Sequence, residues 1–286
     1  MKNVVNKRLS KWFGCRIAKD KPQIVKVGDA GGMLYEKYVQ ESLEKLLVKV
    51  PMSRWLPSDH DLVPLEPSLL AIGVKRIAKV AGREERKKQL RTFIKRACAE
   101  ENFLTALKRL KLSADDAPGL VDAPAWLNIH PWSEEAVDEV IEGQNRTFLN
   151  ENRSHGLSLD AHGGGGACYA GVPIAEEKCE VEVERTVGLM QSVEKNGLVC
   201  REDHRANVSV DVLKKNDGEW GWIVRGGNHR VAVCYGMGVR SLEARVKRLV
   251  YECDADIWPG VRKGVFTRKG AGKYFGRLFG EPDDCL

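Results

Sequence analysis

The sequence predicts an α/β protein in two parts: a basic, mainly helical domain over residues 1–118 and a mixed strand–helix domain over residues 119–286. The run from Trp220 to Gly238 reads in direct succession as a strand, a glycine turn and a helix. Apolar residues in the first third recur at helical spacing. The charge also changes sign along the chain: residues 1–112 carry 25 basic and 12 acidic side chains, whereas residues 113–200 carry 5 and 16.

The first predicted helix lies between two helix-breaking signals. Apolar residues follow a helical period from Leu34 to Val50, after Gly31-Gly32 and before Pro51. The next stretch, residues 55–67, contains three prolines and is expected to be a loop.

The second predicted helix carries a basic stripe on one face and an apolar stripe on the other. The cations recur every fourth residue, at Arg83, Lys87, Arg91 and Lys95. They could bind nucleic-acid phosphates or form a solvated surface. The excess of basic residues over 1–112 as a whole indicates an acidic partner, which could be the middle segment of the same chain. The first of these interpretations makes DNA a candidate partner.

A polar stretch with helix-breaking residues, 113–119, is the predicted boundary between the two domains. The second domain contains four consecutive glycines, Gly163 to Gly166, in a segment that also holds two histidines and an aspartate. This Gly-rich loop is typical of a loop that lets backbone approach a ligand, and equally of an ordinary surface loop.

The second domain then alternates helices and strands. An apolar helical face over residues 183–193 predicts a helix that ends at Asn196-Gly197. Alternating valines over 208–212 predict a strand, and residues 216–218 have the composition of a hairpin turn into a strand at 220–224. A last strand is expected at 242–246.

The junction after residue 224 is the candidate binding site. Gly226-Gly227 permits a turn that a residue with a Cβ would resist, and Asn228 is expected to cap a helix that Gly238 ends. The first amides of such a helix have no partner within it, and Arg230 adds a forked cationic donor. This arrangement favours an anion such as phosphate, although an ordinary strand–helix connection has the same pattern.

These residues resemble the ParB/sulfiredoxin-like superfamily over about residues 180–250. Members carry a strand, then Gly-x-[His or Arg]-Arg, then an Ala-rich helix closed by glycine, then another strand. Here Gly227-Asn228-His229-Arg230 and Gly238 fill those places, residues 184–198 look like the superfamily's first helix, and residues 242–246 look like its closing strand.

The chain departs from the catalytic branches of that superfamily. Sulfiredoxins carry the catalytic cysteine where this chain has Asn228, and ParB-type CTP switches usually carry glutamate there. The free-serine kinases place an aspartate where this chain has Gly226. Reduction of a sulfinic acid is therefore not expected.

What the resemblance implies is a nucleotide cradle. It consists of Gly226, Gly227, Asn228, His229 and Arg230 as contacts to a nucleoside triphosphate, with or without Mg²⁺. Glu184 and His229 are the candidate catalytic residues. The expected function is nucleotide binding, in a small-molecule phosphotransferase or a nucleotide hydrolase. The alternatives are a nucleotide-switched DNA-binding partition or regulatory protein, and a non-catalytic scaffold.

Composition sets the remaining expectations. No apolar run reaches the ~18 residues of a membrane span, and no apolar block follows the basic N-terminus, so a cytoplasmic protein is expected. The 8 cysteines lie far apart without a Cys-x-x-Cys pair, so neither a zinc site nor a disulfide scaffold is expected.

Overall fold

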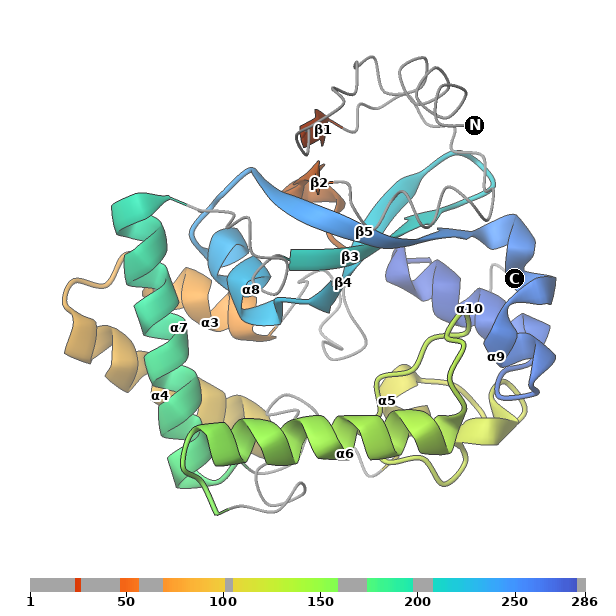
Figure 1. Ribbon diagram of the computed structural model, residues 1–286, viewed down its shortest axis with the longest axis horizontal. Coiled ribbons are helices and arrows are strands. Elements are labelled where there is room, and N and C mark those ends of the chain that lie inside the picture. The colour runs from red at the N-terminus through yellow and green to blue at the C-terminus, as the bar shows by residue number, and fades with distance from the viewer. Residues whose placement is uncertain are drawn as a thin grey trace.

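A five-stranded mixed sheet forms the centre of the protein (Figure 1). The computed structural model describes residues 24–26, 47–56, 69–100, 105–158, 174–197 and 208–281. The strand order is β1-β2-β5-β3-β4, and the sheet confirms the predicted mixed α/β class. The strands are β1 (Ile24–Lys26), β2 (Leu47–Pro51), β3 (Val208–Lys214), β4 (Trp220–Gly226) and β5 (Ser241–Tyr251).

The strand–turn–helix succession of the second half is confirmed. Strands β3 and β4 form an antiparallel hairpin whose turn contains Gly218 with a φ of +94°. Helix α8 (Asn228–Gly236) follows β4, and the chain then enters β5, which pairs with β3 in parallel. Parallel neighbours need a crossover connection, and the β4–α8 unit supplies it.

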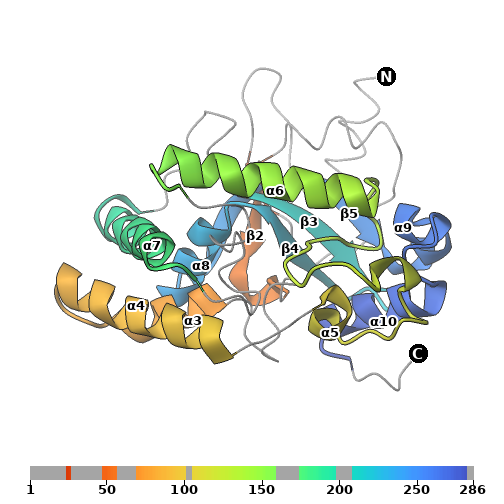
Figure 2. The ribbon, with the colours of Figure 1, turned by 90° about the horizontal axis from the view of Figure 1, so that it is seen from below.

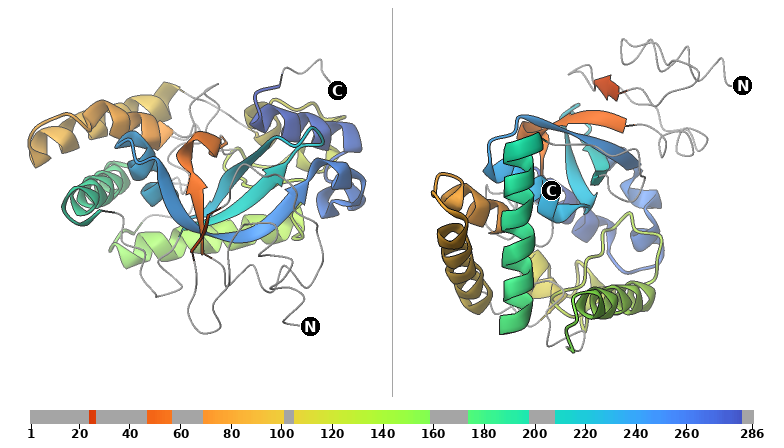
Figure 3. Two further views of the ribbon diagram at one scale, coloured as in Figure 1. Left: turned by 90° about the horizontal axis from the view of Figure 1, so that it is seen from above. Right: turned by 60° about the vertical axis from the view of Figure 1, so that its left-hand side comes forward.

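One face of the sheet is covered by four helices. They are α3 (Leu69–Ile77), α4 (Arg83–Glu100), α7 (Glu176–Asn196) and α8. The valines predicted to alternate in β3 point into this core, together with the fully buried Trp222 of β4 and Val231 of α8. Helices α4 and α7 lie side by side, as Figures 1 and 3 show.

The opposite face of the sheet carries a second core. Leu213, Ile223 and Val250 extend from the sheet into it, because successive strand residues point to opposite faces. The covering elements are α5 (Ala106–Leu110), the short helical segment Glu252–Ile257, α9 (Pro259–Arg262) and α10 (Arg268–Leu278).

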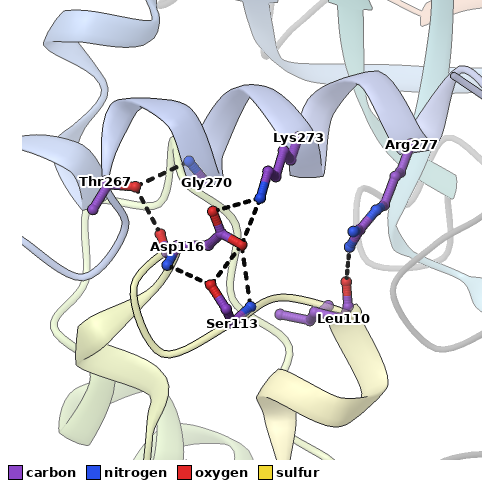
Figure 4. Close-up of polar contacts among 7 residues, drawn as sticks. All are labelled: Leu110, Ser113, Asp116, Thr267, Gly270, Lys273 and Arg277. Carbon is purple, nitrogen blue, oxygen red and sulfur yellow. Dashed lines mark hydrogen bonds and ion pairs between the residues drawn. The ribbon is translucent and has the colours of Figure 1, made fainter. Parts of the chain in front are cut away.

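The buried carboxylate of Asp116 ties the stretch 113–119 to α10 (Figure 4). The Asp116 carboxylate accepts hydrogen bonds from the Ser113 hydroxyl at 2.8 Å and from Lys273 Nζ at 2.9 Å. The backbone carbonyl of Asp116 accepts a hydrogen bond of 2.9 Å from the amide of Thr267, at the start of α10. The stretch 113–119, predicted as a boundary, is therefore packed against the C-terminal helix.

Helix α6 (Val137–Ser154) runs along one side of the molecule, from the α5 end to α7 (Figure 2). Near its middle, Gln144 exchanges hydrogen bonds of 3.0 and 3.1 Å with the backbone of Asn128. At its C-terminal end, Glu151 accepts a hydrogen bond of 2.5 Å from Arg185 of α7. Helix α6 therefore connects the segment around Asn128, near α5, with helix α7.

Two predictions about the N-terminal part are wrong. Residues 47–51, expected to end a helix, form strand β2, because Val48 and Val50 pack into the core while the backbone pairs with β5. The expected boundary near residue 118 does not separate two cores, since β2 belongs to the sheet of the second half and α3 packs on α8. The other residues of the predicted first helix lie outside the described ranges.

Two further expectations meet the limits of the described ranges. The Gly-rich loop 163–166 lies outside them. Among the helices that are described, none combines the length and apolar character needed to cross a membrane.

Candidate functional site

The candidate site lies where β4 turns into α8. Gly227 adopts a φ of +87°, a left-handed conformation that a residue with a Cβ resists, and it is the residue that caps α8. The amides of Arg230 and Val231 both donate to the Gly227 carbonyl, at 2.9 and 3.1 Å. The helix therefore begins at Asn228, and the expectation that the Asn228 side chain is the cap is wrong.

Both glycines also lie close to β3. A Cβ on Gly226 would lie 2.9 Å from the Ser209 hydroxyl oxygen, and one on Gly227 would lie 3.2 Å from a Val208 methyl. The register between β3 and β4 shifts at Ser209 and Val210, which brings the two strands into this contact. The turn therefore presents bare backbone at the start of the helix.

The first turn of α8 offers donors for an anion. Among the described residues, none accepts a hydrogen bond from the amides of Asn228 and His229 or from the Arg230 guanidinium. The start of a helix also carries a partial positive charge. The predicted cradle of residues 226–230 is thus assembled in one place, with its donors available.

The side chain of His229 pairs with a carboxylate other than the predicted Glu184. Its Nε2 makes a short hydrogen bond and ion pair with the carboxylate of Glu182 of α7, whose side chain is only 2% exposed. Lys178, one turn earlier on α7, lies 3.2 Å from the same carboxylate and is 1% exposed. A carboxylate, an imidazole and an ammonium group therefore share a buried space beside the turn.

The electrostatics of this group favour an ionised Glu182. Burial by itself raises the pKa of a carboxyl group, but here the hydrogen bond and charge of His229 outweigh it. Lys178 and Arg185 add to the effect, so the pKa of Glu182 lies well below its usual range. Glu182 is therefore an anion near neutral pH.

Glu184, the predicted catalytic base, points away from this site. Two residues along a helix correspond to about 200° of rotation, so Glu184 and Glu182 lie on opposite sides of α7. The Glu184 carboxylate pairs instead with Arg83 of α4 at 2.8 Å and with Lys87. Glu184 therefore lies outside the candidate site, and Glu182 is the carboxylate that contacts His229.

The whole basic stripe of α4 meets acidic residues of α7. Arg91 grips Glu180 with two donors, one of them at 2.6 Å, and Lys95 pairs with Glu176. The acidic middle segment, expected as a candidate partner for the basic N-terminal part, therefore supplies the carboxylates that pair with the stripe. The four cations are committed to a helix–helix contact, and the structure gives no support for their use on nucleic-acid phosphates.

A second buried carboxylate lies on the other face of the sheet near the turn. Asp211 of β3 is completely buried, and its Oδ2 accepts a hydrogen bond from Trp132 Nε1 at 3.2 Å. Arg225, directly before Gly226, holds its Nε 3.5 Å from the same oxygen. The Asp211 carboxylate therefore helps to hold a further cation next to the turn.

Some of these residues left a signal in the sequence. Lys178 and Glu182 share a helix face with each other, directly beside the apolar face of α7. Asp211 stands among valines in a predicted strand. A charged residue in either setting needs a buried partner, although the sequence does not say which one.

The described residues contain no cluster of three or more side chains typical of a metal site. No protein-family model matches this chain, and no significant match exists among the curated proteins or the solved structures. The geometry of the candidate site is therefore the basis for a functional assignment.

Proposed function

We propose that this protein binds a nucleoside polyphosphate at the turn between β4 and α8. The observation that carries the proposal is the left-handed Gly227 at the start of α8, which exposes backbone amides beside Arg230. Phosphate oxygens accept hydrogen bonds from such amides, and a guanidinium group donates to two phosphate oxygens at once. The resemblance of residues 226–230 to the ParB/sulfiredoxin-like pattern supports a nucleotide as the source of the phosphate.

Within this function, a small-molecule phosphotransferase or a nucleotide hydrolase suits the site best. Both reactions need positive charge around the transferred phosphoryl group and a group that can hold a proton nearby. Arg230 would supply charge, and the pair formed by His229 of α8 and Glu182 of α7 would hold a proton beside the first turn of α8. Mg²⁺, if required, would enter with the phosphates and neutralise part of their charge.

Nucleotide binding is tested by thermal shift with ATP, ADP, CTP and GTP, each with and without Mg²⁺, followed by calorimetry on the best ligand. We expect Arg230→Ala to lose a charge-assisted contact worth ~1.5–3 kcal/mol, which weakens binding about tenfold or more. Arg240→Ala is the control, because Arg240 is an exposed arginine just beyond the other end of α8. A wild-type protein that no nucleotide stabilises overturns the proposal.

A further inference from the structure

The pair formed by His229 and Glu182 is more deeply buried than an ordinary surface ion pair. The Glu182 side chain is 2% exposed and that of His229 is 18% exposed. Since Glu182 is ionised, its oxygen can only accept, so the His229 Nε2 carries the hydrogen of this bond. The other ring nitrogen, Nδ1, has no partner among the described residues.

Three further charged groups surround the pair from α6 and α7. Lys178 Nζ lies 3.2 Å from Glu182 and 3.3 Å from Glu151 of α6, and Arg185 in turn binds Glu151. From α8 itself, the nearest charge in the chain is Arg230, the next residue. In this cluster the two carboxylates, Glu151 and Glu182, are balanced by two cations, Lys178 and Arg185. His229 lies at the edge of the cluster, against Glu182.

Such a cluster is expensive to bury unless each charge is compensated. Two apolar side chains in place of Lys178 and Glu182 would join α6, α7 and α8 without that desolvation cost. Helical packing alone therefore does not account for an ionised Glu182 directly under the first turn of α8.

We infer that Glu182 is a positioning residue of the nucleotide site: it holds His229 through Nε2, so that Nδ1 is the ring nitrogen offered to the bound phosphate. This inference rests on the proposed nucleotide function. In the neutral ring Nδ1 has no hydrogen, whereas in the imidazolium form it carries one and donates to a phosphate oxygen. An anion fixed at Nε2 keeps the hydrogen on that nitrogen and so leaves Nδ1 facing the phosphate site.

The inference is tested first without nucleotide. In ¹⁵N spectra of histidine-labelled protein, with His229→Gln used to assign the signal, the neutral wild-type ring is expected in the Nε2–H form. In Glu182→Gln we expect a mixture of the two tautomers. The control is Glu184→Gln, a carboxamide on the opposite side of the same helix, which should leave the His229 signal as in the wild type.

The second test is the affinity for ATP, or for whichever of the four nucleotides binds best. Glu182→Gln should weaken binding at pH 7 by about threefold to tenfold, because the ring is no longer held with Nδ1 toward the phosphate. Glu184→Gln is the control and should bind the nucleotide as the wild type does.

Loss of Glu182 leaves Lys178 buried without its closest anion, so Glu182→Gln could unfold the protein. The double variant Lys178→Met/Glu182→Gln removes both charges and keeps the measurement available. Unchanged His229 tautomer signals, or a nucleotide affinity equal to that of the wild type, overturn the inference. A wild type that binds no nucleotide overturns the proposed function instead, while the tautomer measurement still decides whether Glu182 orients the ring.

Discussion

The tie between Asp116 and α10 predicts a large loss of stability in Asp116→Ala. The carboxylate is 6% exposed and accepts from the Ser113 amide, the Ser113 hydroxyl and Lys273 Nζ. Hydrogen bonds to a charged group are worth ~1.5–3 kcal/mol, and breaking a fully buried ion pair costs ~3–5 kcal/mol. Because Lys273 is 21% exposed and can recover some hydration, we expect a loss of ~2–3 kcal/mol.

The assay is urea unfolding at 25 °C, together with the thermal midpoint, which should fall by about 3–5 °C. Asp115→Ala is the matched control, since it removes an exposed carboxylate from the adjacent position. Its effect should stay within about 0.5 kcal/mol. A free energy of unfolding of Asp116→Ala equally close to that of the wild type would refute the reasoning.

The same variant has a defined pH dependence. Burial would raise the pKa of Asp116, but the hydrogen bonds from Lys273 and Ser113 and the charge of Lys273 outweigh it and lower the pKa. A carboxyl group with a lowered pKa stabilises the folded state at pH values above its unfolded pKa of about 3.9, and this contribution is lost as pH falls through the folded pKa. The difference between wild type and Asp116→Ala should therefore be full at pH 7 and shrink below about pH 4.

Two other predictions concern packing and the α4–α7 contact. Gly270→Ala should abolish folding, because its Cβ would lie 1.9 Å from the Asp116 carbonyl oxygen, whereas Gly143→Ala, with open space at its Cβ, should stabilise α6 by ~0.5–1 kcal/mol. Both are measured by soluble yield and thermal midpoint. Arg91→Glu should lower the midpoint at low salt by placing like charges against Glu180, with a smaller effect in 1 M NaCl, and the swap Arg91→Glu/Glu180→Arg should restore it. A variant as stable as wild type at low salt contradicts the ion-pair assignment.

The elements of the second half could be predicted because their signals are local. Alternating valines, the hairpin turn and the glycine pair each act over a few residues, and the β3–β4–α8–β5 succession follows from them. The N-terminal strand β2 could not be found this way. Its pairing partner β5 lies almost two hundred residues further along the chain. Val50 also fits the helical period of Leu46 and Leu47, so the pattern did not single out a strand.

The candidate site shows the same division. The turn at Gly227 and the start of α8 follow from neighbouring residues, so this geometry was predicted with only the cap misplaced, while anion binding there stays a prediction. The choice between Glu182 and Glu184 depends on the rotation of α7 relative to two other helices. That orientation is set by which side of α7 packs on α4, and no short pattern encodes it.

The acidic residues of α7 fall into two groups, one paired with the cations of α4 and one buried against α8. Glu176, Glu180 and Glu184 form half-exposed pairs with α4, and such pairs add little stability each, so their spacing tells mainly how two helices are matched. Glu182 is buried against His229, where a charge is costly and an apolar residue of similar size would pack as well. A carboxylate buried in that position, in contact with His229 of the first turn of α8, is therefore better evidence for a function of α8 than the longer and more visible row of ion pairs on the opposite side of α7.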